Sequence, residues 1–117
     1  MEFLHNLNHY CPKKNIISIG NYVGIAQKAG KTAAGDMAAM NALKTAKAQL
    51  LLLAEDIADA TAAELLHLAE AAMLPVLWWP DKVSLGLLVG KSKRGAVAIL
   101  DEGFSRAILK LCEIQQK

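Results

Sequence analysis

The run Leu50-Leu-Leu-Leu-Ala54 restricts the fold more than any other feature of this chain. A short, unbroken apolar run of this kind is typical of a β-strand that is covered on both faces. Three more short apolar segments are strand candidates, at residues 32–34, 76–79 and 96–100. The sequence therefore predicts a central sheet of four strands with other elements packed on both sides.

Amphipathic helices are predicted to cover this sheet. Apolar residues recur at positions 16, 19, 23 and 26, which predicts a helix from Ile16 to about Ala29. The segment Thr61-Ala-Ala-Glu64 has the form of a capping box, and the apolar stripe that follows it ends at Pro75. Three shorter helices complete the set: residues 37–46 after a capping Asp36, residues 82–89, and a last helix capped by Asp101.

Strands and helices thus alternate along the chain. This order predicts an α/β protein with a three-layer α/β/α sandwich, in which helices cover both faces of a four-stranded mixed sheet. Residues 1–14 show no sustained period and are predicted to be a loosely ordered N-terminal segment. Residues 15–117 then form a single domain without a linker or an internal repeat.

The composition indicates a compact protein of the cytoplasm. Apolar residues make up 54% of the 117 residues, and no uncharged apolar run is long enough to span a membrane. The N-terminus lacks the basic-then-apolar pattern of a secretion signal, so we expect no membrane partner. A disulfide between Cys11 and Cys112 is not favoured in a reducing compartment. His5, His9 and Cys11 lack a fourth ligand, so we expect no metal.

Charge is distributed unevenly along the chain. Residues 12–50 contain six lysines and one acid, whereas residues 51–90 contain six acids and one lysine. Lys91, Lys93 and Arg94 then follow within four positions. If the two basic segments meet in space, they form a basic face, and such a face favours a polyanion as partner.

The sequence Gly30-Lys-Thr32 invites comparison with a nucleotide-binding loop. Such a loop needs G-x-x-x-x-G-K-[ST] between a strand and a helix. Gly24 precedes Gly30 by six positions rather than five, and a predicted helix leads into the motif. The acid pairs Glu55-Asp56 and Asp101-Glu102 have no partnered base or metal ligand. We therefore expect neither an enzyme nor a cofactor nor a small-molecule substrate.

Four ordered motifs resemble a known family. They are Ile25-Ala-Gln-Lys-Ala-Gly-Lys-Thr-Ala-Ala-Gly35, Leu51-Leu-Leu-Ala-Glu-Asp56, Leu85-Gly-Leu-Leu-Val-Gly-Lys91 and Ala96-Val-Ala-Ile-Leu-Asp-Glu-Gly-Phe104. Together they resemble the YlxQ-type bacterial branch of the kink-turn RNA-binding ribosomal-protein superfamily, which includes the archaeal protein L-seven-Ae. The resemblance extends from residue 16 to about residue 112.

This resemblance implies an α/β/α sandwich, no catalytic activity and recognition of structured RNA. In relatives the RNA is held by the turn after the first strand, the start of the second helix and the loop before the last strand. Those places correspond here to Lys31–Lys44 and Gly90–Gly95. Kink-turn binders carry Gly-x-Asn-Glu-x-x-Lys across the turn. Here Gly35 matches, but Met37, Ala38 and Asn41 stand where the signature has Asn, Glu and Lys.

The hypothesis is a ribonucleoprotein component of ribosomal-protein type that docks its basic face on structured RNA, with a kink-turn as one candidate. Because Met37 and Ala38 offer no donor or acceptor to base edges, phosphate contacts should dominate. Ribosomal RNA, or an RNA bound during translation, is the expected partner of a free monomer. The expected RNA contacts are Lys31, Gly35, Asp36, Met37, Asn41, Lys44, Lys91, Lys93 and Arg94.

Two alternatives stay open at this point. The fold could serve as a protein-interaction module that has lost specific RNA recognition. Trp78 and Trp79 alternate faces in their predicted strand, and core or rim packing is the preferred interpretation over base stacking.

Overall fold

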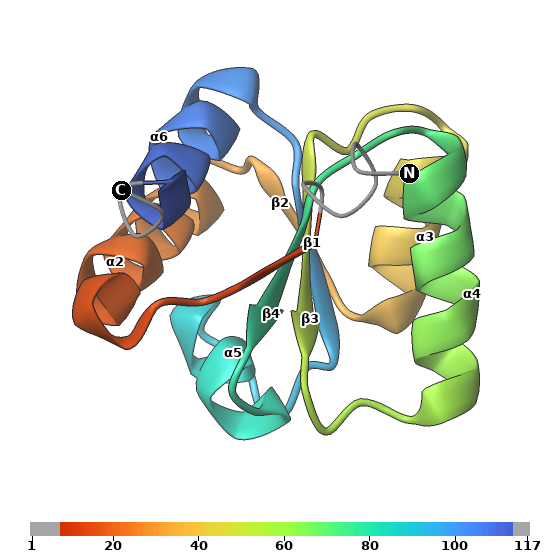
Figure 1. Ribbon diagram of the computed structural model, residues 1–117, viewed down its shortest axis with the longest axis horizontal. Coiled ribbons are helices and arrows are strands. Elements are labelled where there is room, and N and C mark those ends of the chain that lie inside the picture. Colours follow the sequence, from red (N-terminus) through yellow and green to blue (C-terminus); the bar gives the residue numbers. More distant parts are fainter. Residues whose placement is uncertain (1–7, 114–117) are drawn as a thin grey trace.

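A five-stranded mixed sheet forms the centre of the computed structural model, which describes residues 8–113 (Figure 1). The strand order is β1-β4-β3-β5-β2. β1, β4 and β3 run parallel, β5 is antiparallel to β3, and β2 is antiparallel to β5. The strands are β1 (Asn8–Tyr10), β2 (Thr32–Ala34), β3 (Leu50–Ala54), β4 (Val76–Trp79) and β5 (Ala96–Ile99).

The prediction of four strands was wrong, because β1 adds a fifth. This strand lies in the segment expected to be loosely ordered, where three residues are too few to show a period of two. It pairs in parallel with β4, and the N–H of Cys11 extends the pairing to the carbonyl of Trp78 at 3.0 Å. The expectation for residues 1–7 lies outside the described residues.

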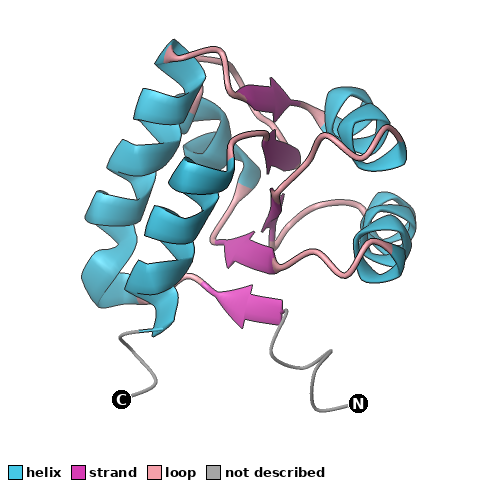
Figure 2. Ribbon diagram, turned by 90° about the horizontal axis from the view of Figure 1, so that it is seen from above, coloured by secondary structure: helices cyan, strands magenta, loops and turns pink. Residues whose placement is uncertain are grey.

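Helices cover both faces of the sheet, so the predicted sandwich architecture is confirmed (Figure 2). Three helices pack on one face and two on the other, and a short 3₁₀ turn, η1 (Lys13–Asn15), precedes the first of them. Within residues 8–113, no helix has the length and apolar character needed to cross a bilayer. The first face carries α2 (Ile16–Lys28), α5 (Lys82–Leu88) and α6 (Glu102–Glu113); the second carries α3 (Asp36–Lys44) and α4 (Asp59–Ala71).

The side chains of β3 contribute to two hydrophobic clusters, one on each face of the sheet. All five of its residues are buried, as its unbroken apolar sequence predicts. Successive side chains of a strand point to opposite faces. Leu50 and Leu52 therefore join the cluster under α2, α5 and α6, whereas Leu51 and Leu53 join the cluster under α3 and α4.

Two of the predicted helix caps are wrong, and one is confirmed. Asp101 Oδ2 accepts a hydrogen bond from the Phe104 N–H at 2.9 Å, as expected of an N-cap. The capping box at Thr61 is absent because α4 begins two residues earlier, at Asp59. Asp36 is not a cap either: it lies inside the first turn of α3, and Gly35 occupies the N-cap position.

Candidate nucleic-acid interface

The turn after β2 lies directly against the loop before β5. A Cβ added at Gly35 would be 3.7 Å from the Arg94 Cδ, and the Gly35 N–H donates to the Ala96 carbonyl at 2.8 Å. A Cβ added at Gly95 would come within 3.1 Å of the Asp36 Oδ1. The two basic segments, distant in sequence, therefore adjoin in space.

Gly35 makes this approach feasible through its backbone conformation. Its φ of 112° lies in the region that favours glycine, which lets the chain turn from β2 into α3 within one residue. A Cβ added here would make only ordinary van der Waals contact with Arg94, at 3.7 Å from its Cδ. A glycine is thus favoured at this position by backbone conformation rather than by packing.

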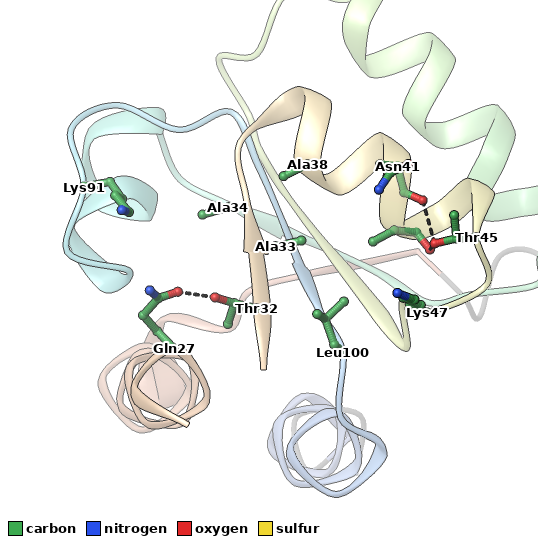
Figure 3. A pocket seen from close by; sticks show the side chains of 11 residues that line it. Gln27, Thr32, Ala33, Ala34, Ala38, Asn41, Thr45, Lys47, Lys91 and Leu100 are labelled. Atoms are coloured by element: carbon green, nitrogen blue, oxygen red, sulfur yellow. Dashed lines mark hydrogen bonds between the residues drawn. The ribbon is translucent and has the colours of Figure 1, made fainter. Parts of the chain in front are cut away.

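Two adjoining grooves open on this surface. The first, here named the loop groove, has a volume of about 620 Å³ and separates the start of α3 from the loop before β5. The second, named the edge groove, has a volume of about 500 Å³ and runs along the open edge of β2 (Figure 3). Ala34 and Ala38 line both grooves, so the grooves share a wall.

The loop groove carries positive charge from two elements. Lys82 projects from the first turn of α5, and Lys93 and Arg94 come from the loop that follows this helix. The Arg94 guanidinium donates from Nη1 to the Lys93 carbonyl at 2.9 Å and to the Ser92 Oγ at 3.3 Å. These bonds keep the cation within its own loop and leave it unpaired with any carboxylate of the described chain.

Asp36 is the single acid that lines the loop groove. Its Oδ1 is buried and has no hydrogen-bond partner among the described residues. The ion pair found within residues 8–113 joins Arg106 to Glu102 on α6, so none of these cations is neutralised by direct pairing. The groove therefore presents cations that are available to an anionic partner.

Backbone hydrogen bonds fix the basic loop to α5. The Arg94 N–H donates to the Lys82 carbonyl at 3.1 Å, and the Lys91 N–H donates to the Gly86 carbonyl at 2.9 Å. Asp56 supports the same helix start, because its Oδ1 accepts from the Lys82 N–H at 2.9 Å. The backbone of the basic loop is consequently held against α5.

The structure divides the nine predicted contact residues into three groups. The loop groove is lined by Gly35, Asp36, Met37, Lys93 and Arg94. Asn41 and Lys91 line the edge groove instead. Lys31 and Lys44 are exposed and line neither groove.

Sequence reasoning missed five polar residues that line the grooves. One of them, Lys82, directly follows Asp81, the N-cap of α5. The Asp81 Oδ1 accepts from the Ser84 N–H at 2.7 Å, which lowers the pKa of Asp81. The other four line the edge groove, and no local pattern marks them as a site. They are Gln27, Thr32, Thr45 and Lys47.

The remaining candidates from the sequence lie elsewhere. The ring of Tyr10 stacks on that of Trp78 with centroids 6.1 Å apart, and Trp79 is buried. Neither Cys11 nor Cys112 forms a disulfide, and burial, with a smaller effect of Cys112, raises the pKa of Cys11 to about 12. Among residues 8–113 no three potential metal ligands gather, and His5 lies outside that range.

The fold and these grooves define a small α/β/α protein with a basic surface built on a strand-to-helix turn. The model of the ribosomal protein L7Ae/L30e/S12e/Gadd45 family matches residues 17–109, and the chain belongs to this family. It is 29% identical over 91 residues to the RNA-binding protein YlxQ of Bacillus subtilis (strain 168). That alignment covers 78% of this chain and 91% of the relative.

Solved structures share the fold. A protein of unknown function from Bacillus halodurans superposes with a TM-score of 0.76 at 25% identity, covering 81% of this chain and 96% of the other. The 15.5kD RNA binding protein of Giardia lamblia gives a TM-score of 0.74 at 20% identity. That likeness covers 90% of this chain and 92% of the Giardia chain, and it supports the fold alone.

Proposed function

We propose that this protein binds structured RNA, with the loop groove as the principal contact surface. The observation that carries the proposal is the juxtaposition of Gly35 with Arg94, which brings both basic segments to one place. Membership of a ribosomal-protein family and the likeness to YlxQ support RNA as the polyanion. Ribosomal RNA, met in the cytoplasm by a free monomer, is the first natural target to test.

The loop groove holds the RNA through its phosphates. Lys82, Lys93 and Arg94 supply three cations that are not paired with carboxylates of the described chain. The start of α3 adds backbone N–H groups and the positive end of a helix dipole on the opposite side. Gly35 lets a sugar-phosphate chain approach the backbone closely, because no side chain stands in the way.

The exposed side chains at the start of α3 are poorly suited to form hydrogen bonds with base edges. Met37 is 80% exposed, and Ala38 is also exposed, so both could meet a bound RNA. Neither side chain has a hydrogen-bond donor or a strong acceptor for a base edge. The energy of binding in the loop groove therefore comes mainly from phosphates and decreases steeply with salt.

Binding to three RNAs across a salt series tests this function. A kink-turn RNA, a plain duplex and a scrambled control are compared by filter binding. All three should bind at low salt, and Lys93→Ala should flatten the salt slope by about 1. Lys110→Ala, on the outer surface of α6, is the matched control and should leave the slope unchanged.

Two outcomes would contradict the proposed function or the proposed mode of RNA binding. Absence of binding to all three RNAs at low salt would overturn it and favour a protein-interaction module with this fold. A strong preference for the kink-turn that persists at high salt would overturn the assignment of phosphates as the main contact. It would instead indicate base reading at the start of α3.

A further inference from the structure

We propose that the edge groove reads one unpaired nucleotide, preferentially adenine, beside the RNA segment held in the loop groove. This inference rests on the proposed RNA-binding function and adds a site of base selection to it. The edge groove differs from the loop groove in its lining, which combines side-chain amides and two hydroxyls with two lysines.

The strand that borders this groove directs backbone groups into it. β2 is the last strand of the sheet, so one of its sides is open. The Lys31 carbonyl accepts from the Leu100 N–H, and the Gly35 N–H donates to Ala96, each at 2.8 Å. Because hydrogen-bonded pairs alternate in an antiparallel ladder, Thr32 and Ala34 direct their N–H and C=O groups to the open side.

Asn41 provides a carboxamide that is free to recognise a base. Its backbone carbonyl accepts from the Thr45 Oγ1 at 2.9 Å, but its side chain has no hydrogen-bond partner among the described residues. The side chain is exposed on the α3 side of the groove. A free carboxamide offers a donor and an acceptor together, which complement adenine through its N6 amino group and N7.

Gln27 and Thr32 form a second polar pair on the opposite side of β2. The Thr32 hydroxyl donates to the Gln27 Oε1, as the dashed line in Figure 3 marks. That bond occupies the acceptor of Gln27 and orients its amide, so the Nε2 group acts as a donor. Gln27 can therefore supply a further hydrogen bond to the base or its sugar.

The shape and charge of the groove suit a nucleotide. Ala33, Ala34 and Ala38 line it with little side-chain bulk, which leaves room for a flat ring. Lys91 and Lys47 lie on opposite sides of β2 in Figure 3, where they can hold the phosphates on either side of the base. A volume of about 500 Å³ falls in the usual range of small-ligand sites.

In this proposal the loop groove binds the RNA backbone and the edge groove selects a base. At the start of α3, Met37 and Ala38 cannot pair with a base edge, whereas Asn41 lies one turn further along the same helix. Because Ala34 and Ala38 line both grooves, an RNA strand that leaves the loop groove enters the edge groove without a gap. The groove proposed to bind the RNA backbone and the groove proposed to select a base therefore lie side by side on one surface.

Duplexes with single-stranded tails test this inference. One duplex sequence is prepared blunt and with a 3′ tail of six adenines, six cytosines or six uracils, and each is titrated with the whole protein. The adenine tail should bind about tenfold more tightly than the other two tails. Asn41→Ala should abolish that preference. Asn21→Ala, an exposed asparagine on α2, is the matched control.

The outcomes separate this inference from the proposed function. Equal affinity for the three tails, with the blunt duplex still bound, would overturn the adenine site while RNA binding stands. An equal loss of affinity for every RNA on Asn41→Ala would assign Asn41 to a phosphate and overturn the site as well. Failure of every RNA to bind would overturn the proposed function itself.

Discussion

Gly86 of α5 lies so close to Ser92 that a Cβ at position 86 would overlap the Ser92 carbonyl oxygen. The same Cβ would come within 2.7 Å of the Ser92 carbonyl carbon and within 3.2 Å of the Arg94 nitrogen. These are backbone atoms of the basic loop, which cannot rotate away as a side chain can. The absence of a side chain at Gly86 therefore determines the path of the loop that carries Lys91, Lys93 and Arg94.

Gly86→Ala should displace this loop and weaken RNA binding. We expect a loss of about 1–3 kcal/mol in the free energy of unfolding, because the added methyl group overpacks a buried contact. Urea unfolding and filter binding measure the two effects. Gly24→Ala is the control, since its Cβ would lie 3.6 Å from the Leu88 carbonyl, an ordinary contact. Equal behaviour of the two variants would show that the loop adapts to Gly86→Ala without cost.

Lys82 should contribute to RNA binding although it lies outside both basic segments of the sequence. Its side chain lines the loop groove with Lys93 and Arg94. Lys82→Ala should lower affinity for all RNAs alike and reduce the salt slope by about 1, as the loss of one phosphate contact does. The exposed Lys14 in η1 serves as the control position. An unchanged slope in Lys82→Ala would place the RNA away from α5.

Restoring the kink-turn signature should create kink-turn preference. Met37→Asn with Ala38→Glu places the two base-reading side chains of the family at exposed positions of α3. The ratio of affinities for a kink-turn RNA and a plain duplex should increase about tenfold or more, since each base contact discriminates by about 1–3 kcal/mol. Competition binding at moderate salt measures this ratio. If it stays constant, the RNA does not approach the start of α3 in the manner of the family.

Cys11 should react slowly with iodoacetamide at neutral pH. The thiolate is the reactive form, and burial together with Cys112 raises the pKa of Cys11 to about 12. The labelling rate should therefore keep increasing with pH well beyond the ordinary value of 9.0. Peptide mapping by mass spectrometry distinguishes Cys11 from Cys112. Labelling as fast as in the urea-unfolded chain would contradict the raised pKa.

The same raised pKa predicts how stability changes with pH. Below pH 9.0 the Cys11 thiol is protonated in both states and contributes no pH dependence. Between 9.0 and about 12 the unfolded chain releases this proton and the folded chain retains it. The unfolded state then binds fewer protons, so the free energy of unfolding decreases as pH increases through this window. Urea unfolding of Cys11→Ala should show a weaker decrease.

The sheet was largely predictable because the buried central strands consist of apolar residues. Every residue of β3 and β5 is buried, so both strands appear as unbroken apolar runs. β1 was not predictable, because Asn8–Tyr10 contains polar residues and forms a strand only through the open side of β4. Its stability comes from a partner that is distant in sequence.

The candidate site was predictable where basic residues mark it in the sequence. It was not predictable where the fold brings together residues that are distant in the sequence. Charge and the family resemblance identified Gly35 and the basic loop. The cap at Asp36 was wrong because Gly35, with its φ of 112°, already occupies the N-cap. The edge groove joins Gln27 to Leu100 across the β2–β5 pair, and that pairing brings together residues more than seventy positions apart.

The position of β5 determines when the surface proposed to bind RNA becomes complete. β5 lies between β3 and β2 and is the last strand of residues 8–113, so β2 has no neighbour in the sheet until residues 96–99 have been synthesised. Both grooves take part of their lining from the segment between Lys91 and Leu100. A nascent chain that ends before this segment lacks part of the lining of each groove. The surface that we propose for RNA binding is therefore complete only once β5 has paired with β2.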